Sequence, residues 1–193
     1  MLVSVGQVAL VVAFMVSGYA SAMSFLGGRL KAPHFVSSAR YGLYTTPLLL
    51  LIVTLTLMYA FVTHDFSVQY VVENSSHAMP PVYTWVAFYA GNAGSLLYLA
   101  FGFSIIVVIA GVTTSRHLPS LAPYASGIMA LLLTFFLGVL VFLANPLDRL
   151  PVPLTDGQGI NPLLVHFGMF IHPPVQMTGL VSVALPFSIA MGA

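Results

Sequence analysis

The chain has 193 residues, of which 59% are hydrophobic and only 5% are charged. Ordinary soluble domains carry roughly 25% charged residues, so this composition excludes a soluble domain. It indicates an all-α integral membrane protein. The formal net charge is +1, without a basic run and without cysteine, which excludes nucleic-acid binding, disulfides and thiolate metal sites.

Five apolar segments are long enough to cross a bilayer as helices, since one crossing takes about 20 residues. No basic residue precedes Arg29, so the first segment is interpreted as a permanent span and not as a cleaved secretory signal. The last segment has no closing loop, and we therefore expect the chain to be a fragment of a larger multi-span bundle. The predicted single membrane domain, residues 1–193, has spans at residues 3–26, 43–62, 92–112, 121–143 and 174–193.

The basic residues predict the orientation of these spans. Arg29, Lys31 and Arg40 lie between the first and second spans, and Arg116 lies between the third and fourth. The positive-inside rule places both connections in the cytoplasm. We therefore expect two loops at the outer, periplasmic face, together with the N-terminus: residues 63–82 and 145–172.

The first outer loop and the residues that follow it show three local patterns. Residues 66–72 alternate apolar and polar side chains, which predicts a short extended segment over the membrane surface. Residues 83–89 are rich in aromatic side chains and include Trp85, which favours an anchor at the headgroup level. Small residues at positions 90–95 begin the third span and allow another backbone to approach closely.

The second outer loop ends in the sequence His172-Pro173-Pro174, where a polar segment turns into the last span. Proline disfavours a helical conformation in the residue before it, so His172 is predicted to be non-helical, with Pro174 in or near the first helical turn. A helix N-terminus also disfavours protonated histidine, which leaves a ring nitrogen free for a metal. These properties suit an axial haem ligand.

The positions of the histidines limit where haem is held. None is expected in the middle of a span, so the five helices are not expected to clamp a bis-histidine haem inside the bilayer. All six lie in predicted loops or at span ends: His34, His64, His77, His117, His166 and His172.

Four stretches, in this order, carry a family resemblance: AFVTHDFSVQYV at residues 60–71, YAGNAGSLL at 89–97, ANP at 144–146, and DGQGINPLL at 156–164 running into IHPP at 171–174. Together they resemble the CcmF/NrfE-type cytochrome c haem lyase family. Three places depart from its pattern. Tyr89 stands where the family has tryptophan, and Ala93 replaces an acidic or amide residue. After the two prolines, residues 175–177 (VQM) replace the usual leucine-tyrosine stretch. The resemblance covers nearly the whole chain but only the first portion of a family member.

The resemblance implies that haem b, delivered by a haem chaperone, is held at the outer face between two histidines and attached to apocytochrome c. His172, followed by Pro173 and Pro174, corresponds to the first of those histidines and would ligate the haem iron. The tryptophan-rich haem segment and the second histidine of the family lie beyond the matched portion. We therefore expect no catalytic residue in this chain and no lyase activity from it alone.

The further partners that the resemblance implies are other maturation subunits or the C-terminal part of the lyase. The implied location is the bacterial inner membrane or an organellar inner membrane.

Two other residues are weaker candidates for haem contact. His166 would hydrogen-bond a haem propionate or have no role, and Arg149 would pair with a propionate or with its neighbour Asp148. The competing function is a non-catalytic structural or transport subunit of a multi-span assembly. Transport predicts ionisable groups within the spans, which are essentially absent, so a structural role is the stronger alternative.

Overall fold

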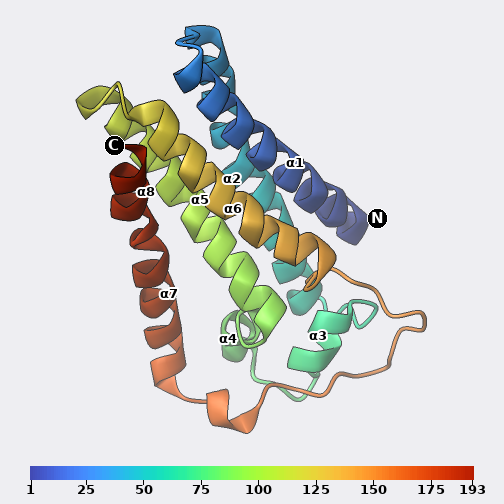
Figure 1. Ribbon diagram of the computed structural model, residues 1–193. Helices are drawn as coiled ribbons and strands as arrows, with labels where there is room; N and C mark the ends of the chain where they lie inside the picture. Colours follow the sequence, from blue (N-terminus) through green and yellow to red (C-terminus); the bar gives the residue numbers. More distant parts are fainter.

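Five helical segments of the computed structural model, which describes residues 1–193, are long and apolar enough to cross a membrane. The structure contains no strand, so the prediction of an all-α membrane protein with about five spans is confirmed. Four of the five are continuous helices, which lie side by side in Figure 1: α1 (Leu2–Arg29), α2 (Pro33–Val62), α5 (Asn92–His117) and α6 (Ala122–Phe142).

The fifth segment, residues 167–192, is not one continuous helix. It contains a 3-10 turn, η3 (Phe167–Phe170), and two helices, α7 (His172–Ser182) and α8 (Ala184–Gly192). Pro186 has no backbone N–H to donate to the carbonyl of Ser182, and its ring crowds that carbonyl, which explains the break at Val183. The fifth span predicted over residues 174–193 is therefore made of two helices and not of one continuous helix.

The second long helix begins earlier than hydropathy suggested. Residues 29–41 were expected to form a cytoplasmic connection, but α2 begins at Pro33 and the connection is confined to residues 30–32. Proline suits the first helical position, and the polar residues that follow it are compatible with a helix that extends beyond the apolar layer. Polarity there marks the edge of the apolar region and not the end of the helix.

The long helices pack through small and hydroxyl side chains. On α1, Ala13, Ser17 and Ala20 are fully buried. The Ser17 hydroxyl donates to the Ala130 carbonyl of α6 at 3.1 Å, and the Ser21 hydroxyl donates to the Gly127 carbonyl at 2.9 Å. Lipid offers no hydrophobic force between helices, so close packing and hydrogen bonds of this kind hold α1 against α6.

The irregular segments lie at one end of the bundle (Figure 1). The prediction of an extended segment at residues 66–72 is wrong, because Tyr70, Val71 and Val72 are consecutive buried residues of a short helix. Successive side chains of a strand point to opposite faces, so three consecutive residues of a strand cannot all face inward. One helical turn that is surrounded by other parts of the protein can bury all three. The short elements there are α3 (Gln69–Asn74), η1 (Pro81–Tyr83), α4 (Thr84–Phe88) and η2 (Pro162–Leu164).

The aromatic stretch at residues 83–89 also differs from its prediction. Trp85 is exposed, as expected of an interfacial ring, but Phe88 is fully buried and Tyr89 is nearly so. Val86 and Ala87 are buried as well, so most of this stretch packs inside the protein. The small residues after it allow that packing, because α5 starts directly against α3 and α4.

A test of this close approach uses two glycines of α5. A Cβ at Gly94 would overlap the Phe88 carbonyl oxygen and the Tyr70 side chain, whereas a Cβ at Gly102 would meet nothing within 4 Å. Gly94→Ala should therefore destabilise the protein by about 1–3 kcal/mol. Gly102→Ala should be neutral or stabilising by up to about 1 kcal/mol. Thermal unfolding in detergent measures both, and equal midpoints for the two variants would contradict the packing.

Candidate functional site

Two irregular segments, residues 63–91 and 143–171, form a layer that we call the loop cap. Their backbones are joined directly: Gln69 N–H donates to the Asp148 carbonyl at 2.9 Å, and Leu150 N–H donates to the Ser67 carbonyl at 2.9 Å. Further along, Gln158 N–H donates to the Val72 carbonyl at 2.7 Å. The two segments therefore satisfy one another's backbone groups, as irregular chain near a membrane must.

Asp156 and the glycines after it form the tightest part of the loop cap. The Asp156 carboxylate accepts hydrogen bonds from the N–H groups of His77, at 2.9 Å, and Gly157, at 2.7 Å. These bonds hold the pKa of Asp156 below its ordinary value. The depressed pKa means that this link is intact above pH 3.8 and is lost as the pH falls through the lowered value. A Cβ at Gly157 would overlap the Ser75 carbonyl oxygen, so the close contact requires glycine.

Tyr70 of α3 fixes the turn between α4 and α5. Its hydroxyl donates towards the carbonyls of Phe88, at 3.1 Å, and Gly91, at 3.2 Å, and accepts from the Gly91 N–H at 2.9 Å. Burial raises the pKa of Tyr70 to about 12, so the hydroxyl remains a neutral donor. The beginning of α5 is therefore tied to the first half of the loop cap.

Tyr89 connects this framework to the residues that precede α7. Its hydroxyl donates to the Met169 carbonyl of η3 at 2.8 Å. The Ser95 hydroxyl donates to the Tyr89 carbonyl at 2.8 Å, and the rings of Tyr83 and Phe170 lie 5.8 Å apart. The short segment before His172 is thus anchored on α4 and α5, although it is mostly irregular.

His172 is the first residue of α7, with Pro173 and Pro174 in the first turn. The expectation that Pro174 lies near the helix start is confirmed, but the expectation that His172 is non-helical is wrong. The preceding residue, Ile171, has φ −115° and ψ −51° and serves as the N-cap, so the transition occurs one residue earlier. The first turn has free backbone donors in any case, which makes two prolines acceptable there.

The side chain of His172 is exposed and lies among exposed apolar residues. Ile171 and Val175 are 55% and 65% exposed, and Phe167 is 72% exposed. No group of three or more His, Cys, Asp or Glu side chains is arranged to hold a metal ion.

The two weaker candidates occupy different places. His166 precedes η3, and its Nδ1 accepts the Gly168 N–H at 3.0 Å, which gives this ring a local structural role. The backbone of Arg149 pairs with Val68 in an isolated antiparallel bridge on the α3 side of the loop cap. The helix of His172 instead contacts α5 and η3, so Arg149 and His172 lie in different parts of the structure.

Several contacts in the loop cap were not predicted from the sequence. The rings of His64 and His77 stack with centroids 4.8 Å apart, and Phe66 meets His77 edge-on at 5.1 Å. The roles of Tyr70 and Asp156 were also missed. The only available signals were a tyrosine ahead of a glycine-rich stretch and an Asp-Gly pair, and neither identifies its partner.

No family model matches the chain, but curated relatives do. It is 32% identical over 198 residues to the cytochrome c-type biogenesis protein CcmF of Pseudomonas aeruginosa, covering 100% of the chain and 30% of the relative. It is 34% identical over 200 residues to CcmF of Haemophilus influenzae, covering 98% and 30%. A solved structure, Cytochrome c Heme Lyase CcmF, has the same fold with a TM-score of 0.85 at 24% identity, covering 100% of this chain and 30% of that one. The chain thus spans about 30% of the length of these proteins.

The anchoring role of Tyr89 is tested by Tyr89→Phe, with Tyr98→Phe as the matched control. Tyr89→Phe removes the bond to Met169, worth about 1 kcal/mol net, so opening of residues 167–171 should increase about fivefold. The Tyr98 ring lies 5.9 Å from that of Tyr89 but is not bonded to η3. Hydrogen exchange in this segment measures the effect, and equal exchange in both variants would show that the bond does not anchor η3.

Proposed function

Because the chain belongs, as an N-terminal part, to the CcmF/NrfE-type family of cytochrome c-type biogenesis proteins, we propose that it holds haem at the outer membrane face for attachment to apocytochrome c. The single observation that carries the proposal is the setting of His172. Its imidazole is exposed at the start of a helix, among apolar side chains, on a segment anchored by Tyr89.

The setting of His172 suits a haem ligand for two physical reasons. The exposed apolar side chains of Phe167, Ile171 and Val175 offer a surface for the apolar face of the macrocycle. Pro173 and Pro174 stiffen the backbone at that point, so the imidazole is held in a narrow range of directions.

Haem is a substrate in this proposal, and the chain supplies one part of its binding site. Thioether formation adds a cysteine thiol across a vinyl group of haem, and we assign no catalytic residue of this chain to that step. The second axial ligand comes from another polypeptide segment, because no other histidine belongs to α7 or its anchored approach except His166, whose Nδ1 is already bonded. The proposed partners are a haem chaperone, apocytochrome c, and other maturation subunits or the C-terminal part of the lyase.

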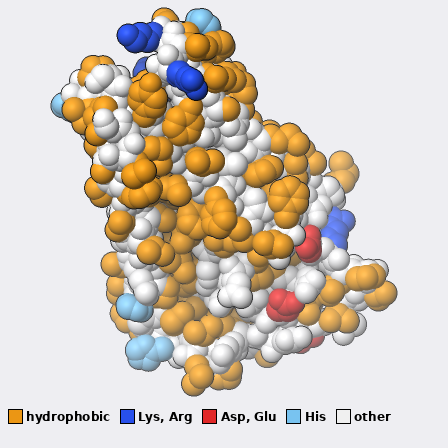
Figure 2. All heavy atoms as spheres, viewed as in Figure 1, with side chains coloured by type: hydrophobic (Ala, Val, Ile, Leu, Met, Phe, Trp, Pro, Cys, Tyr) orange, Lys and Arg blue, Asp and Glu red, His pale blue; other side chains and the backbone are white.

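The charge distribution supports the orientation that this function needs. Figure 2 shows most of the visible Lys and Arg side chains at the upper end of the bundle, and the visible acidic side chains, with one basic side chain beside them, towards the lower end, where the loop cap lies. The upper end contains Arg29, Lys31, Arg40 and Arg116. We propose that this end faces the cytoplasm and that the loop cap, with His172 beside it, faces the periplasm across a bacterial inner membrane.

Single-cysteine labelling of intact cells tests this orientation. The chain has no cysteine of its own, so each introduced thiol gives an unambiguous signal. Gln158 in the loop cap and Ser37 near the start of α2 are both exposed. A membrane-impermeant maleimide should label Gln158→Cys and label Ser37→Cys only after the cells are lysed. The reverse pattern would refute the orientation.

The ligand role of His172 is tested by His172→Ala in cells that contain the complete maturation machinery. Haem retention and holocytochrome yield should fall at least about tenfold, since even partners of metal ligands typically contribute 10- to 100-fold to metal affinity. Exogenous imidazole should restore part of the yield by entering the vacated position.

His166→Ala is the matched control, because it removes an exposed histidine six residues away whose Nδ1 only caps η3. Membrane levels of both variants should equal those of the wild type. A His172→Ala protein that matures cytochrome at the wild-type rate would reduce His172 to the first residue of a helix.

A further inference from the structure

The end of the bundle that we propose to face the cytoplasm carries basic side chains that have no acidic partner. We call it the basic end and define it by Arg29, Lys31, Arg40 and Arg116. The four acidic residues of the chain all lie in the loop cap at the opposite end: Asp65, Glu73, Asp148 and Asp156. The positive charge at the basic end is therefore balanced by solvent ions or by an anion that binds there.

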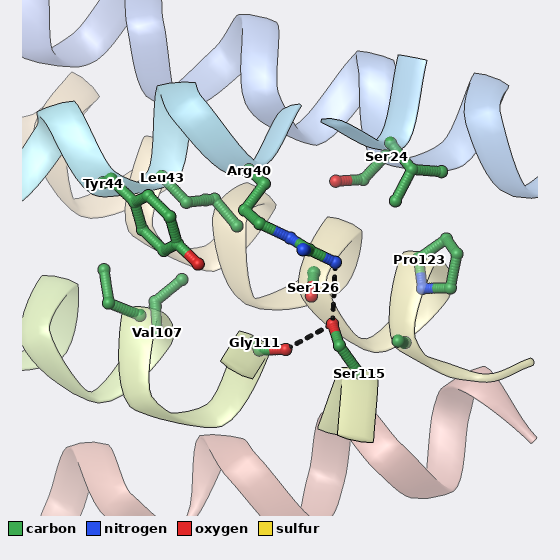
Figure 3. A pocket seen from close by; sticks show the side chains of 12 residues that line it. Ser24, Arg40, Leu43, Tyr44, Val107, Gly111, Ser115, Pro123 and Ser126 are labelled. Atoms are coloured by element: carbon green, nitrogen blue, oxygen red, sulfur yellow. Dashed lines mark hydrogen bonds between the residues drawn. The ribbon is translucent and has the colours of Figure 1, made fainter. Parts of the chain in front are cut away.

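A pocket between α1, α2, α5 and α6 opens at the basic end (Figure 3). The Arg40 guanidinium reaches across it from α2 and donates to the Ser115 hydroxyl of α5 at 3.3 Å. Ser115 in turn donates to the Gly111 carbonyl at 2.6 Å. A single bond to a neutral hydroxyl leaves most of the five donors of the guanidinium unused.

Other hydroxyl groups in this pocket have no partner there. Figure 3 shows no hydrogen bond from Ser24, Tyr44 or Ser126 to another lining residue, and the Ser24 hydroxyl points into the same space as the guanidinium. Ser24 is only 2% exposed. The serines one and two turns earlier on the same face of α1, Ser21 and Ser17, both donate to α6 carbonyls. The Ser24 oxygen is not one of the fully buried unpartnered atoms of the chain, so it is open to the pocket and free to bond a polar occupant there.

A second hollow adjoins the pocket through Val36 and Pro123, which line both, and has a volume of about 410 Å³. Lys31 lies on its wall, and α2 and α6 both begin there. Neither helix has a side-chain cap bond or an acidic residue in its first turn. Two helix N-termini without side-chain caps direct partial positive charge towards the same hollow.

We propose that the basic end binds the phosphate group of an anionic phospholipid, held by Arg40 at the mouth of the pocket, with Lys31 on the wall of the adjoining hollow. The space enclosed within the pocket, about 20 Å³, admits roughly one water, so the phosphate stays at the mouth and a water reaches Ser24. An outward stripe on α2 continues from Arg40 through residues at helical spacing. Tyr44, Leu48, Leu51 and Leu55 are all exposed on that stripe, and they accommodate the acyl chains.

This stripe favours a phospholipid over free phosphate, because a free phosphate has no acyl chains to contact the apolar stripe beside its binding site. The inference is independent of haem binding, since it concerns residues at the opposite end from His172. The binding of anionic lipid would also hold the basic end at the headgroup level of one leaflet.

Titration of the purified chain in zwitterionic detergent tests the proposal, with thermal stability and native mass spectrometry as readouts. Phosphatidylglycerol should bind and raise the unfolding midpoint, whereas phosphatidylcholine and inorganic phosphate should have little effect. Arg40→Gln should weaken phosphatidylglycerol binding about fivefold, since one cation near a membrane surface contributes about 1 kcal/mol. Ser24→Ala should weaken it less and leave the lipid-free midpoint unchanged.

Arg149→Gln is the matched control, because it removes one exposed cation from the loop cap at the other end. It should leave phosphatidylglycerol binding unchanged. Equal losses in Arg40→Gln and Arg149→Gln would reveal non-specific charge attraction and overturn the site. Equal binding of phosphatidylcholine would do the same, and equal stabilisation by inorganic phosphate would show a phosphate site and overturn the lipid assignment.

Discussion

Backbone groups that leave a helix near a bilayer must find partners within the protein, and this requirement shapes the whole loop end of the molecule. The two irregular segments meet the requirement by pairing with each other, through Gln158 with Val72 and Leu150 with Ser67. Asp156 adds a side-chain link to His77. The loop cap is consequently a fixed layer and not a set of free loops. It also fixes where α5 begins, because Tyr70 bonds the Gly91 backbone and the first turn of α5 packs closely against it.

The same layer positions the residue proposed to contact haem. A continuous series of bonds leads from α3 through Tyr70 to the turn at Gly91, and Tyr89, two residues before that turn, holds η3 at Met169. His172 follows directly and is exposed. An exposed ligand on an anchored segment allows a second ligand and a protein substrate to approach from outside, which suits a chain that spans about 30% of the length of its relatives. The spans carry few ionisable groups, which argues against a transport pathway.

Hydropathy was sufficient to predict the number and approximate location of the spans, because bilayer thickness sets their length. It misplaced the start of α2, since Pro33 and the polar residues after it are compatible with helix outside the apolar layer. It also missed the break before Pro186, which depends on one absent N–H. The contacts of Tyr70 with Gly91 and of Asp156 with His77 join residues 21 and 79 positions apart, and no local pattern encodes such pairs. A helix start close to His172 was predictable, although the helix begins one residue earlier than expected. The anchorage of His172 by Tyr89 required the structure.

Ligation of haem iron by His172 is measured most directly by low-temperature electron paramagnetic resonance of ferric haem bound to this chain together with the rest of the lyase. Wild-type and His172→Ala complexes, prepared at equal haem occupancy, are compared by their difference spectrum. We predict that a low-spin signal from haem with two axial nitrogen ligands is present in the wild type, is lost in His172→Ala, and returns when imidazole is added. An identical spectrum from the two complexes would contradict the assignment of His172 as an axial ligand.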